Sequence, residues 1–541
     1  MTDCGFHPLM RGRLAAVLAL YSVVSAYDLS APPISQTLWR QTQTAELTRN
    51  FVSSGFDWDG LCIYTHGKTP VIVHYDFPIF NVMAGLFDNA FGHSPFTGKA
   101  IAFVFGGVAA VAVYWLAASL LSGRLDDAAA SSAAATAAIL FVTCPISGLM
   151  NTGYQPDSMA LALTLAGSLC LAKVPANGIP GLVTAASLLT AATLIKLPIV
   201  IPYLPMLGAM AWHAAHRCPR LILPAVVMFA ICLMPVAWWY FLREVPGFGL
   251  MSEEQLTAMF RVGDLSRFTR AGFYLKPAIA TSILVLGGVG VAFFFVGCAW
   301  QPGVAAAVVL GVVLYYVLIP TVADQYYYLY PVVPLFGVVV ALGCERARRV
   351  ASWERASIRA LAIGTVSIWL LVLFAGWAYV LRQDRVILAA AQDLKARVGL
   401  DETVLFLPAH DRVVGRGSFN PAFFYFAQAK GWVGDTTRLR TAGALEREVA
   451  DLDVQWIVAT RYTPDLETMF GQLLPRGYRN EPYDDSAELW ASLKRHYSLV
   501  SEQPNWVIFR VLDRRSGPAS SQLHQQTASE TATAWHGEGA K

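Results

Sequence analysis

Long apolar runs separated by short polar turns fill most of the chain up to residue 381. A helix needs about 20 mostly apolar residues to cross the hydrocarbon core of a membrane. The pattern therefore predicts about eleven transmembrane helices, at residues 12–27, 98–122, 128–147, 158–173, 179–195, 198–215, 221–242, 277–299, 303–320, 328–344 and 359–381. The first run resembles a secretory signal peptide, but no small-residue cleavage site precedes Asp28. We therefore expect it to remain as the first helix.

The segments outside these runs predict a second, soluble domain. Exterior loops are expected at residues 28–95 and 243–276, the first with a helical stretch at 43–53. Residues 382–515 have a soluble composition and predict a small α/β domain, with strands near 404–407, 454–458 and 507–511 and helices near 389–398, 442–451 and 465–474. Residues 516–541 are expected to be disordered. The fold class is thus an α-helical polytopic membrane domain, residues 1–381, with a C-terminal exterior α/β domain.

Composition supports this interpretation. Hydrophobic residues make up 55% of the 541 residues and charged residues only 14%, against roughly 25% charged in ordinary soluble proteins. So few charges could not solvate a soluble surface of this size. The formal net charge of +3 gives no indication of a nucleic-acid partner. The eight cysteines show no metal-site spacing and suggest no disulfide framework.

The positions of Lys and Arg predict the orientation. With the N-terminus in the cytoplasm, the cytoplasmic turns carry Arg124, Arg217, Arg220 and the basic loop at 345–359. An odd number of helices then places the C-terminal domain on the opposite, outer side of the membrane.

Several motifs hold the residues that could carry chemistry. The first exterior loop contains Trp39-Arg40-Gln41-Thr42-Gln43-Thr44-Ala45 and, later, Asp76-Phe77-Pro78. Further along come Tyr154-Gln155-Pro156-Asp157, Lys196 in a Leu-Ile-Lys-Leu-Pro turn, and Asp324-Gln325-Tyr326-Tyr327-Tyr328. In this order the motifs resemble those of the RgtA/B/C/D-like branch of glycosyltransferase superfamily C, which has WRQ-x-(D/Q)-T-A followed by an acidic-Phe-Pro tripeptide. That superfamily also contains aminoarabinose lipid A transferases and protein O-mannosyltransferases.

The resemblance implies a reaction. Such enzymes take a hexose or pentose from a polyprenyl phosphate, here undecaprenyl phosphate, and pass it to a hydroxyl of a cell-envelope glycan or lipid such as lipopolysaccharide, usually with inversion. They work at the outer face of the bacterial inner membrane, which would make the C-terminal domain periplasmic. The chemistry needs a carboxylate to take the acceptor proton and cations to hold the leaving phosphate. Assistance by a divalent cation, Mg²⁺ or Mn²⁺, stays open.

Asp28 and Asp76 are the candidates for the catalytic base. Asp28 follows the first apolar run, close to where the superfamily commonly places its acidic residue, and Asp76 holds the acidic position of the tripeptide. Gln43 stands where many relatives have Asp, and because a neutral amide cannot act as a base, we expect it to contact substrate instead. The simpler alternatives are a solvated charge at a helix end for Asp28 and a loop-ordering acid for Asp76.

Arg40, Lys196 and Arg270 are the candidates for holding phosphate, and Asp157 and Tyr327 are candidates for further substrate contacts. The two parallel N–H groups of a guanidinium suit phosphate, and a lysine among apolar residues is costly unless it serves a function. The alternatives are a structural ion pair for Arg40, snorkelling for Lys196, an N-cap for Asp157 and an interfacial aromatic belt for Tyr327. Long loops such as that of Arg270 also tolerate basic residues on the outer side.

Two other kinds of protein remain as alternatives. A transporter or flippase of lipid-linked glycans often shows repeated halves, and we find no internal repeat. A glycan polymerase or ligase would use lipid-diphosphate donors and release diphosphate rather than monophosphate lipid.

Overall fold

The computed structural model describes residues 8–29, 31–33, 37–72, 76–242, 269, 271–319, 326–350, 356–380, 385–399, 401–408, 421–434, 444–460 and 486–511. The chain divides into two compact units. The first comprises Met1–Ile63 and Val71–Arg385, and the second comprises Tyr64–Pro70 and Val386–Lys541. The predicted helix at 465–474, the predicted disordered tail and Arg270 lie outside the described residues.

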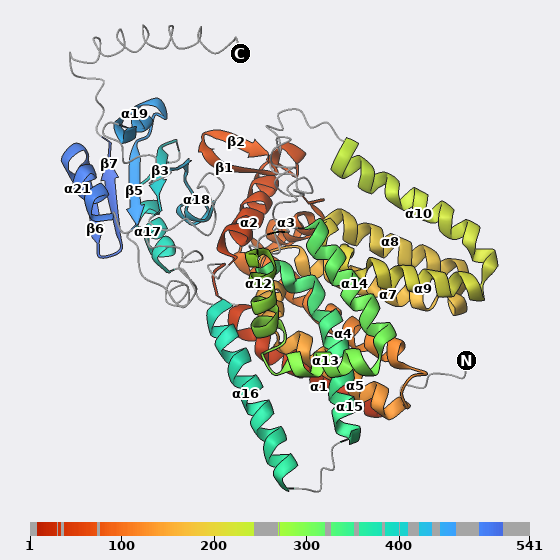
Figure 1. Cartoon of the computed structure of the whole chain (residues 1–541). Helices are drawn as coiled ribbons and strands as arrows, with labels where there is room; N and C mark the ends of the chain where they lie inside the picture. The colour runs from red at the N-terminus through yellow and green to blue at the C-terminus, as the bar shows by residue number, and fades with distance from the viewer. Residues whose placement is uncertain are drawn as a thin grey trace. The chain divides into compact units, whose positions relative to one another are not determined.

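The first unit is built from helices (Figure 1). In chain order these are α1 (Pro8–Leu29), α2 (Leu38–Ser53), η1 (Trp58–Gly60), α3 (Ile79–Phe91), α4 (Pro95–Leu121), α5 (Asp127–Thr143), α6 (Pro145–Thr152), α7 (Asp157–Ala172), α8 (Val174–Val200), η2 (Ile201–Tyr203), α9 (Leu204–Arg217), η3 (Pro219–Leu221), α10 (Ile222–Ala237), η4 (Trp238–Leu242), α12 (Ala271–Ala280), η6 (Thr281–Val285), α13 (Gly290–Trp300), α14 (Pro302–Leu318), η8 (Tyr326–Val332), α15 (Val333–Val350) and α16 (Ala356–Val380). Each apolar run predicted from the sequence contains helix, and the helical stretch expected at 43–53 lies within α2.

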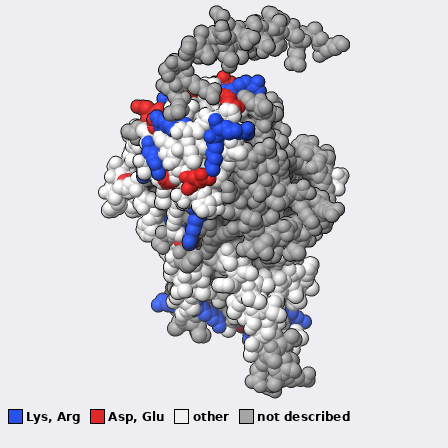
Figure 2. Space-filling model, turned by 90° about the vertical axis from the view of Figure 1, so that its left-hand side faces the viewer, with Lys and Arg blue, Asp and Glu red and all other residues white. Residues whose placement is uncertain are grey.

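Length and hydropathy identify which described helices can cross a membrane. Four helical segments qualify among the described residues: Pro95–Leu121, Val174–Arg217, Pro219–Tyr240 and Tyr326–Val350. The number rises to six if each of two bent pairs is one span, Asp127–Thr143 with Pro145–Thr152 and Pro277–Val285 with Gly290–Trp300. In Figure 2 the visible face of this unit is mostly uncharged, whereas charges of both signs cover the second unit. The polytopic helical fold is therefore present, and the count of eleven spans stays a prediction.

Small residues bring the helices of this unit close together. α4 begins with Pro95 after Ser94, whose side chain accepts the Phe96 N–H. Gly98 of α4 packs against the Tyr154 ring, and Gly106 packs against Tyr21 of α1. A side chain at either glycine would collide with the neighbouring ring. This close packing, which is common between helices in membranes, fixes the chain just before α7 against α4.

The second unit is a mixed sheet covered by helices. Its described strands are β1 (Cys62–Gly67), β2 (Thr69–Ile72), β3 (Thr403–Leu407), β4 (Lys430–Val433), β5 (Trp456–Thr460), β6 (Ser498–Gln503) and β7 (Trp506–Arg510), in the order β2-β1-β4-β3-β5-β7-β6. β4, β3 and β5 are parallel, and β1, β7 and β6 pair antiparallel with their neighbours. The helices are α17 (Arg385–Lys395), α18 (Ala422–Ala427), α19 (Ala444–Asp451) and α21 (Ser486–His496). Residues 64–70 of the first exterior loop thus complete a sheet made mostly by the C-terminal region.

Both faces of this sheet are buried. Along β3, Val404 and Phe406 join a core with α17 and α18, whereas Leu405 and Leu407 join a core with α19 and α21. A strand covered on both faces is apolar throughout, which is why β3, β5 and β7 were predicted correctly. The sequence prediction missed β1, β2, β4 and β6, because none of these four strands is a continuous apolar run.

Candidate functional site

The candidate residues gather at one end of the helical unit. α4 begins near Lys99, which pairs with Asp28 at the end of α1. At the other end of α4, the turn before α5 contains Asp126, which pairs with Arg349 of α15 at 3.0 Å. α4 is 27 residues long, or roughly 40 Å at 1.5 Å per residue. The acidic candidates and the basic end of α15 are therefore on opposite ends of the unit.

A polar cavity lies among the candidates. Its empty volume is about 550 Å³, and it lies between α2, the loop before α3 and the turn before α7. The residues that line it are Arg40, Gln43, Thr44, Leu47, Leu61, Asp76, Phe77, Pro78, Phe80, Asn81 and Pro156. Three residues chosen from the sequence, Arg40, Gln43 and Asp76, thus share one cavity wall.

Asp157 and Lys196 form a buried ion pair beside this cavity. Asp157 begins α7 directly after the cavity residue Pro156. The Lys196 Nζ lies 2.6 Å from Oδ1 and 2.7 Å from Oδ2 of Asp157, and both side chains are buried. Because a buried charge without a partner is very costly, each residue makes the other tolerable. Neither side chain is a solvated surface charge.

A proline explains why Lys196 lies where it does. α8 is interrupted at Lys196, whose backbone is extended, two residues before Pro198. Pro198 has no N–H, so the carbonyl four residues earlier, that of Leu194, has no helical donor. The Phe77 N–H donates a hydrogen bond to this Leu194 oxygen at 3.0 Å, and the Tyr240 hydroxyl donates to the same oxygen at 2.9 Å. The break in α8 thereby holds the loop that carries Asp76.

The surroundings of Asp76 suit a group that exchanges a proton. Its side chain is half-buried. Burial raises the pKa of the Asp76 carboxyl from 3.8, Lys196 and Arg40 lower it, and Asp157 raises it further. The net shift of the pKa is upward. Asp76 is therefore a better proton acceptor than an ordinary surface aspartate, because its conjugate acid is weaker.

Aromatic side chains hold Arg40 in place. The Arg40 Nη1 donates to the Tyr328 hydroxyl at 2.9 Å. Its guanidinium carbon lies 5.3 Å from the Trp39 ring centre and 5.8 Å from those of Tyr327 and Tyr328. These cation–π contacts orient the guanidinium without neutralising its charge. Tyr327 is buried, so it acts in this structure as a support for Arg40.

Asp28 lies in a separate, closed pair. Its Oδ2 lies 3.2 Å from the Lys99 Nζ and accepts the Thr152 hydroxyl at 2.8 Å. Lys99 also donates to the backbone carbonyls of Asp28 and Ala31. Asp28, Lys99 and Thr152 are each about 1% exposed. The sequence analysis overlooked Lys99 and Thr152, although a lysine at the start of an apolar run was a usable signal.

The chain from Asn151 to Asp157 connects the two acidic pairs. Asn151 accepts the Tyr330 hydroxyl at 2.5 Å, and the Tyr154 N–H donates to the Gln41 Oε1 at 3.2 Å. One short segment thus contacts α2, η8 and, through Thr152, the end of α1.

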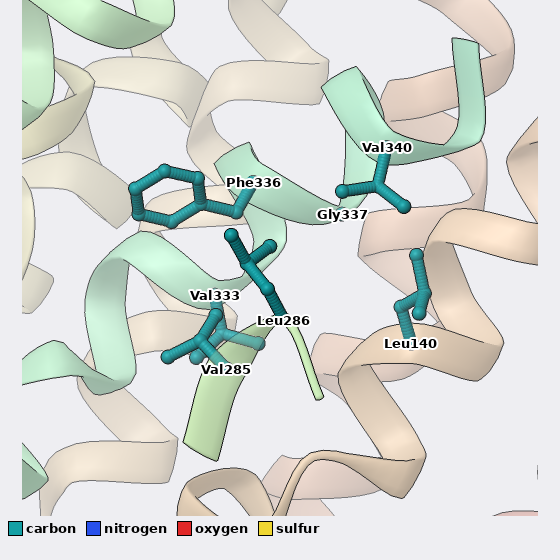
Figure 3. A pocket seen from close by; sticks show the side chains of 7 residues that line it. All are labelled: Leu140, Val285, Leu286, Val333, Phe336, Gly337 and Val340. Atoms are coloured by element: carbon teal, nitrogen blue, oxygen red, sulfur yellow. The ribbon is translucent and has the colours of Figure 1, made fainter. Parts of the chain in front are cut away.

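Two other features are relevant to ligand binding. Within the described residues, no three His, Cys, Asp or Glu side chains lie close enough together to hold a metal ion. A second cavity of about 220 Å³ lies between α5, η6 and α15 (Figure 3). The residues that line it are Leu140, Val285, Leu286, Val333, Phe336, Gly337 and Val340. All are apolar, so this cavity has no side chain that could hold a phosphate.

No protein-family model matches the chain, and no curated protein matches it in sequence. Solved structures do match in fold. ArnT from Cupriavidus metallidurans bound to undecaprenyl phosphate is 12% identical, with a TM-score of 0.56 over 94% of this chain and 99% of that one. Its apo state is 14% identical, with a TM-score of 0.55 and the same coverage.

A more distant match is the archaeal oligosaccharyltransferase AglB from Archaeoglobus fulgidus, in complex with an inhibitory peptide and a dolichol-phosphate. It is 11% identical, with a TM-score of 0.52 over 95% of this chain and 75% of that one. These likenesses confirm the fold expected for glycosyltransferase superfamily C.

Proposed function

We propose that this chain, which shares its fold with ArnT and AglB, transfers a monosaccharide from a polyprenyl-phosphate donor to a hydroxyl of a cell-envelope glycan or lipid. The site would face the outer side of a bacterial inner membrane. The observation that carries the proposal is that Arg40 and Asp76 line one polar cavity, while the ion pair of Asp157 and Lys196 interacts electrostatically with Asp76. ArnT was solved with undecaprenyl phosphate, which supports a lipid phosphate as the donor.

Each residue at the cavity has a role in the proposed reaction. The acceptor oxygen attacks the anomeric carbon, the bond from that carbon to the phosphate oxygen breaks, and polyprenyl phosphate leaves. Asp76 takes the acceptor proton, and Arg40 stabilises the charge that develops on the phosphate. Lys196 has three N–H donors, so one can turn to the phosphate while Asp157 holds the others. Because this is a single displacement, the sugar configuration inverts.

The geometry favours Asp76 over Asp28 as the base. Asp76 lines the cavity and is half-buried. Asp28 is almost fully buried and bound to Lys99 and Thr152. A base must come within hydrogen-bond reach of the proton that it takes. Asp28 is thus better suited to hold the end of α1 than to meet an acceptor.

The remaining candidates have lesser roles. Gln43 lines the cavity and, as an amide, can donate and accept hydrogen bonds to sugar hydroxyls. Tyr327 supports Arg40. Arg270 remains a proposed phosphate contact on sequence grounds. Assays with EDTA and with added Mg²⁺ or Mn²⁺ test whether a divalent cation assists the transfer.

Asp76→Asn tests the proposal. The purified chain in detergent is given synthetic polyprenyl-phosphate sugars and delipidated or lipid-linked envelope glycans, and polyprenyl phosphate release and glycan products are measured. Asp76→Asn should lower turnover at least about 100-fold, as expected for loss of a general base. Asp126→Asn is the matched control, because Asp126 is exposed and at the opposite end of the unit.

The outcomes separate the alternatives. Full turnover by a folded Asp76→Asn variant would show that another group is the base. A transporter would show no turnover in detergent and would need a sealed vesicle. Release of lipid diphosphate would identify a polymerase or ligase instead.

A further inference from the structure

A half-exposed tryptophan stands beside the cavity. Trp58 begins η1 and is 47% exposed, although burying a side chain of this size is strongly favourable. Its flanking residues, Asp57 and Asp59, are exposed as well. The roles proposed for the cavity residues concern the proton, the phosphate and sugar hydroxyls, and none of them distinguishes one acceptor from another.

The turn that carries Trp58 is tightly built. The Asp57 side chain accepts the Asp59 N–H at 3.3 Å, and the Gly60 N–H donates to the Asp57 carbonyl at 2.9 Å. Gly60 packs so closely on Ser54, at the end of α2, that a side chain there would collide with it. Trp58 is therefore presented by a fixed turn, and its exposure is a property of the fold.

Trp58 belongs to an aromatic cluster that reaches the cavity. Its ring centre lies 6.3 Å from that of Phe77 and 6.3 Å from that of Trp239, and Phe77 and Trp239 meet edge to face at 4.6 Å. Phe77 lines the cavity and follows Asp76 directly. A ligand lying on Trp58 would thus come close to the proposed base.

From this cluster we propose that Trp58, with Asp57 and Asp59 beside it, forms a binding site for the acceptor, and that the acceptor is a saccharide. This inference rests on the proposed function and names the acceptor class. The C–H face of a pyranose ring packs well on the electron-rich face of an indole. The carboxylates on either side accept hydrogen bonds from sugar hydroxyls.

The same chemistry disfavours a lipid surface as the occupant. Aromatic residues at membrane interfaces often lie among headgroups, but the anionic headgroups there attract basic rather than acidic residues. Two exposed carboxylates beside Trp58 would be repelled there. A neutral or amino sugar meets no such repulsion.

Saccharide binding by the full-length chain in detergent tests the site. The probes are an array of lipid-free oligosaccharides released from bacterial envelopes by mild acid. Trp58→Ala should weaken saccharide binding roughly tenfold or more, as for other aromatic anchors. Trp58→Phe, which keeps an aromatic ring, should retain much of the parent chain's affinity. Trp212→Ala is the matched control, because Trp212 is 70% exposed on α9. Undecaprenyl monophosphate binding, measured in parallel, should be equal in all variants.

Each outcome decides the matter. The inference is overturned if Trp58→Ala binds saccharides as tightly as the parent chain, or if the parent binds none. It is also overturned if, in nanodiscs, brominated phospholipids quench the fluorescence of Trp58, measured as the quenching present in the parent chain and missing from Trp58→Phe. The indole ring would then face lipid. Failure of the parent chain to bind undecaprenyl monophosphate would count against the proposed donor and leave the saccharide result standing.

Discussion

Pro198→Ala probes how the fold holds its proposed base. Pro198 leaves the Leu194 carbonyl without a helical donor, and the Phe77 N–H takes that place at 3.0 Å. Alanine restores an N–H at position 198 that competes for the same oxygen. The substitution should therefore loosen the loop carrying Asp76 while it strengthens α8.

The size of the effect follows from one hydrogen bond. A backbone hydrogen bond contributes about 0.5–1.5 kcal/mol, so its loss lowers the equilibrium constant for docking of the loop by about 2- to 13-fold. The turnover rate kcat should fall with the docked fraction, by at most that factor. The melting temperature should stay equal or rise, because proline inside a helix costs about 3 kcal/mol relative to alanine. Lower activity with undiminished stability is the expected signature.

The measurement combines transfer assays in detergent with thermal unfolding followed by intrinsic fluorescence. Pro180→Ala is the control, since Pro180 is exposed in the same helix and does not line the cavity. The reasoning is refuted if Pro198→Ala retains the parent kcat. A loss of activity that accompanies a lower melting temperature would also refute it, because general unfolding would then explain the loss.

Three further predictions concern charged groups. Asp28→Asn should destabilise the helical unit by about 3–5 kcal/mol by leaving Lys99 unpaired, and adding Lys99→Met should recover most of the loss; an unchanged melting temperature for the single variant would contradict this. In pH profiles of kcat/KM, activity should be lost on acidification at a pH above 3.8, because the raised pKa of Asp76 makes this base protonate earlier; an acid limb at or below 3.8 would count against Asp76. In the second unit, a hydrogen bond from Arg510 of β7 lowers the pKa of Glu402 from 4.5 to about 2. The ionised Glu402 side chain therefore stabilises the folded unit fully above pH 4.5, and this contribution is lost as the pH falls from 4.5 towards 2. Acid titration of unfolding should show Glu402→Gln removing that dependence, with the exposed Glu502→Gln as control, and an unaltered titration would show the reasoning to be wrong.

The apolar pattern by itself predicted most of the secondary structure. Each predicted apolar run contains helix, and β3, β5 and β7 lie where uninterrupted apolar segments required them. The apolar runs predict these elements well because burial in lipid or between two layers of helices demands apolar residues at almost every position. β4 and β6 are only partly buried, so their sequences contain polar residues and show no continuous apolar run.

Three residues chosen from the motifs lie close together in the structure. Arg40, Gln43 and Asp76 were selected from sequence and line one cavity. Their meeting with Lys196 depends on a hydrogen bond between segments more than 100 residues apart, Phe77 to Leu194. No local pattern contains that information, because the carbonyl of Leu194 becomes available only when Pro198 interrupts a folded helix.

The sequence alone determined that the chain is a helical membrane protein with a second, α/β unit, because the length of the apolar runs and the number of charged residues depend directly on the surrounding solvent. The tertiary structure decided which acids stay available. It closed Asp28 against Lys99, joined Asp157 to Lys196 and left Asp76 facing a cavity. Those pairings depend on distances between helices, and such distances are set by the packing of the folded chain.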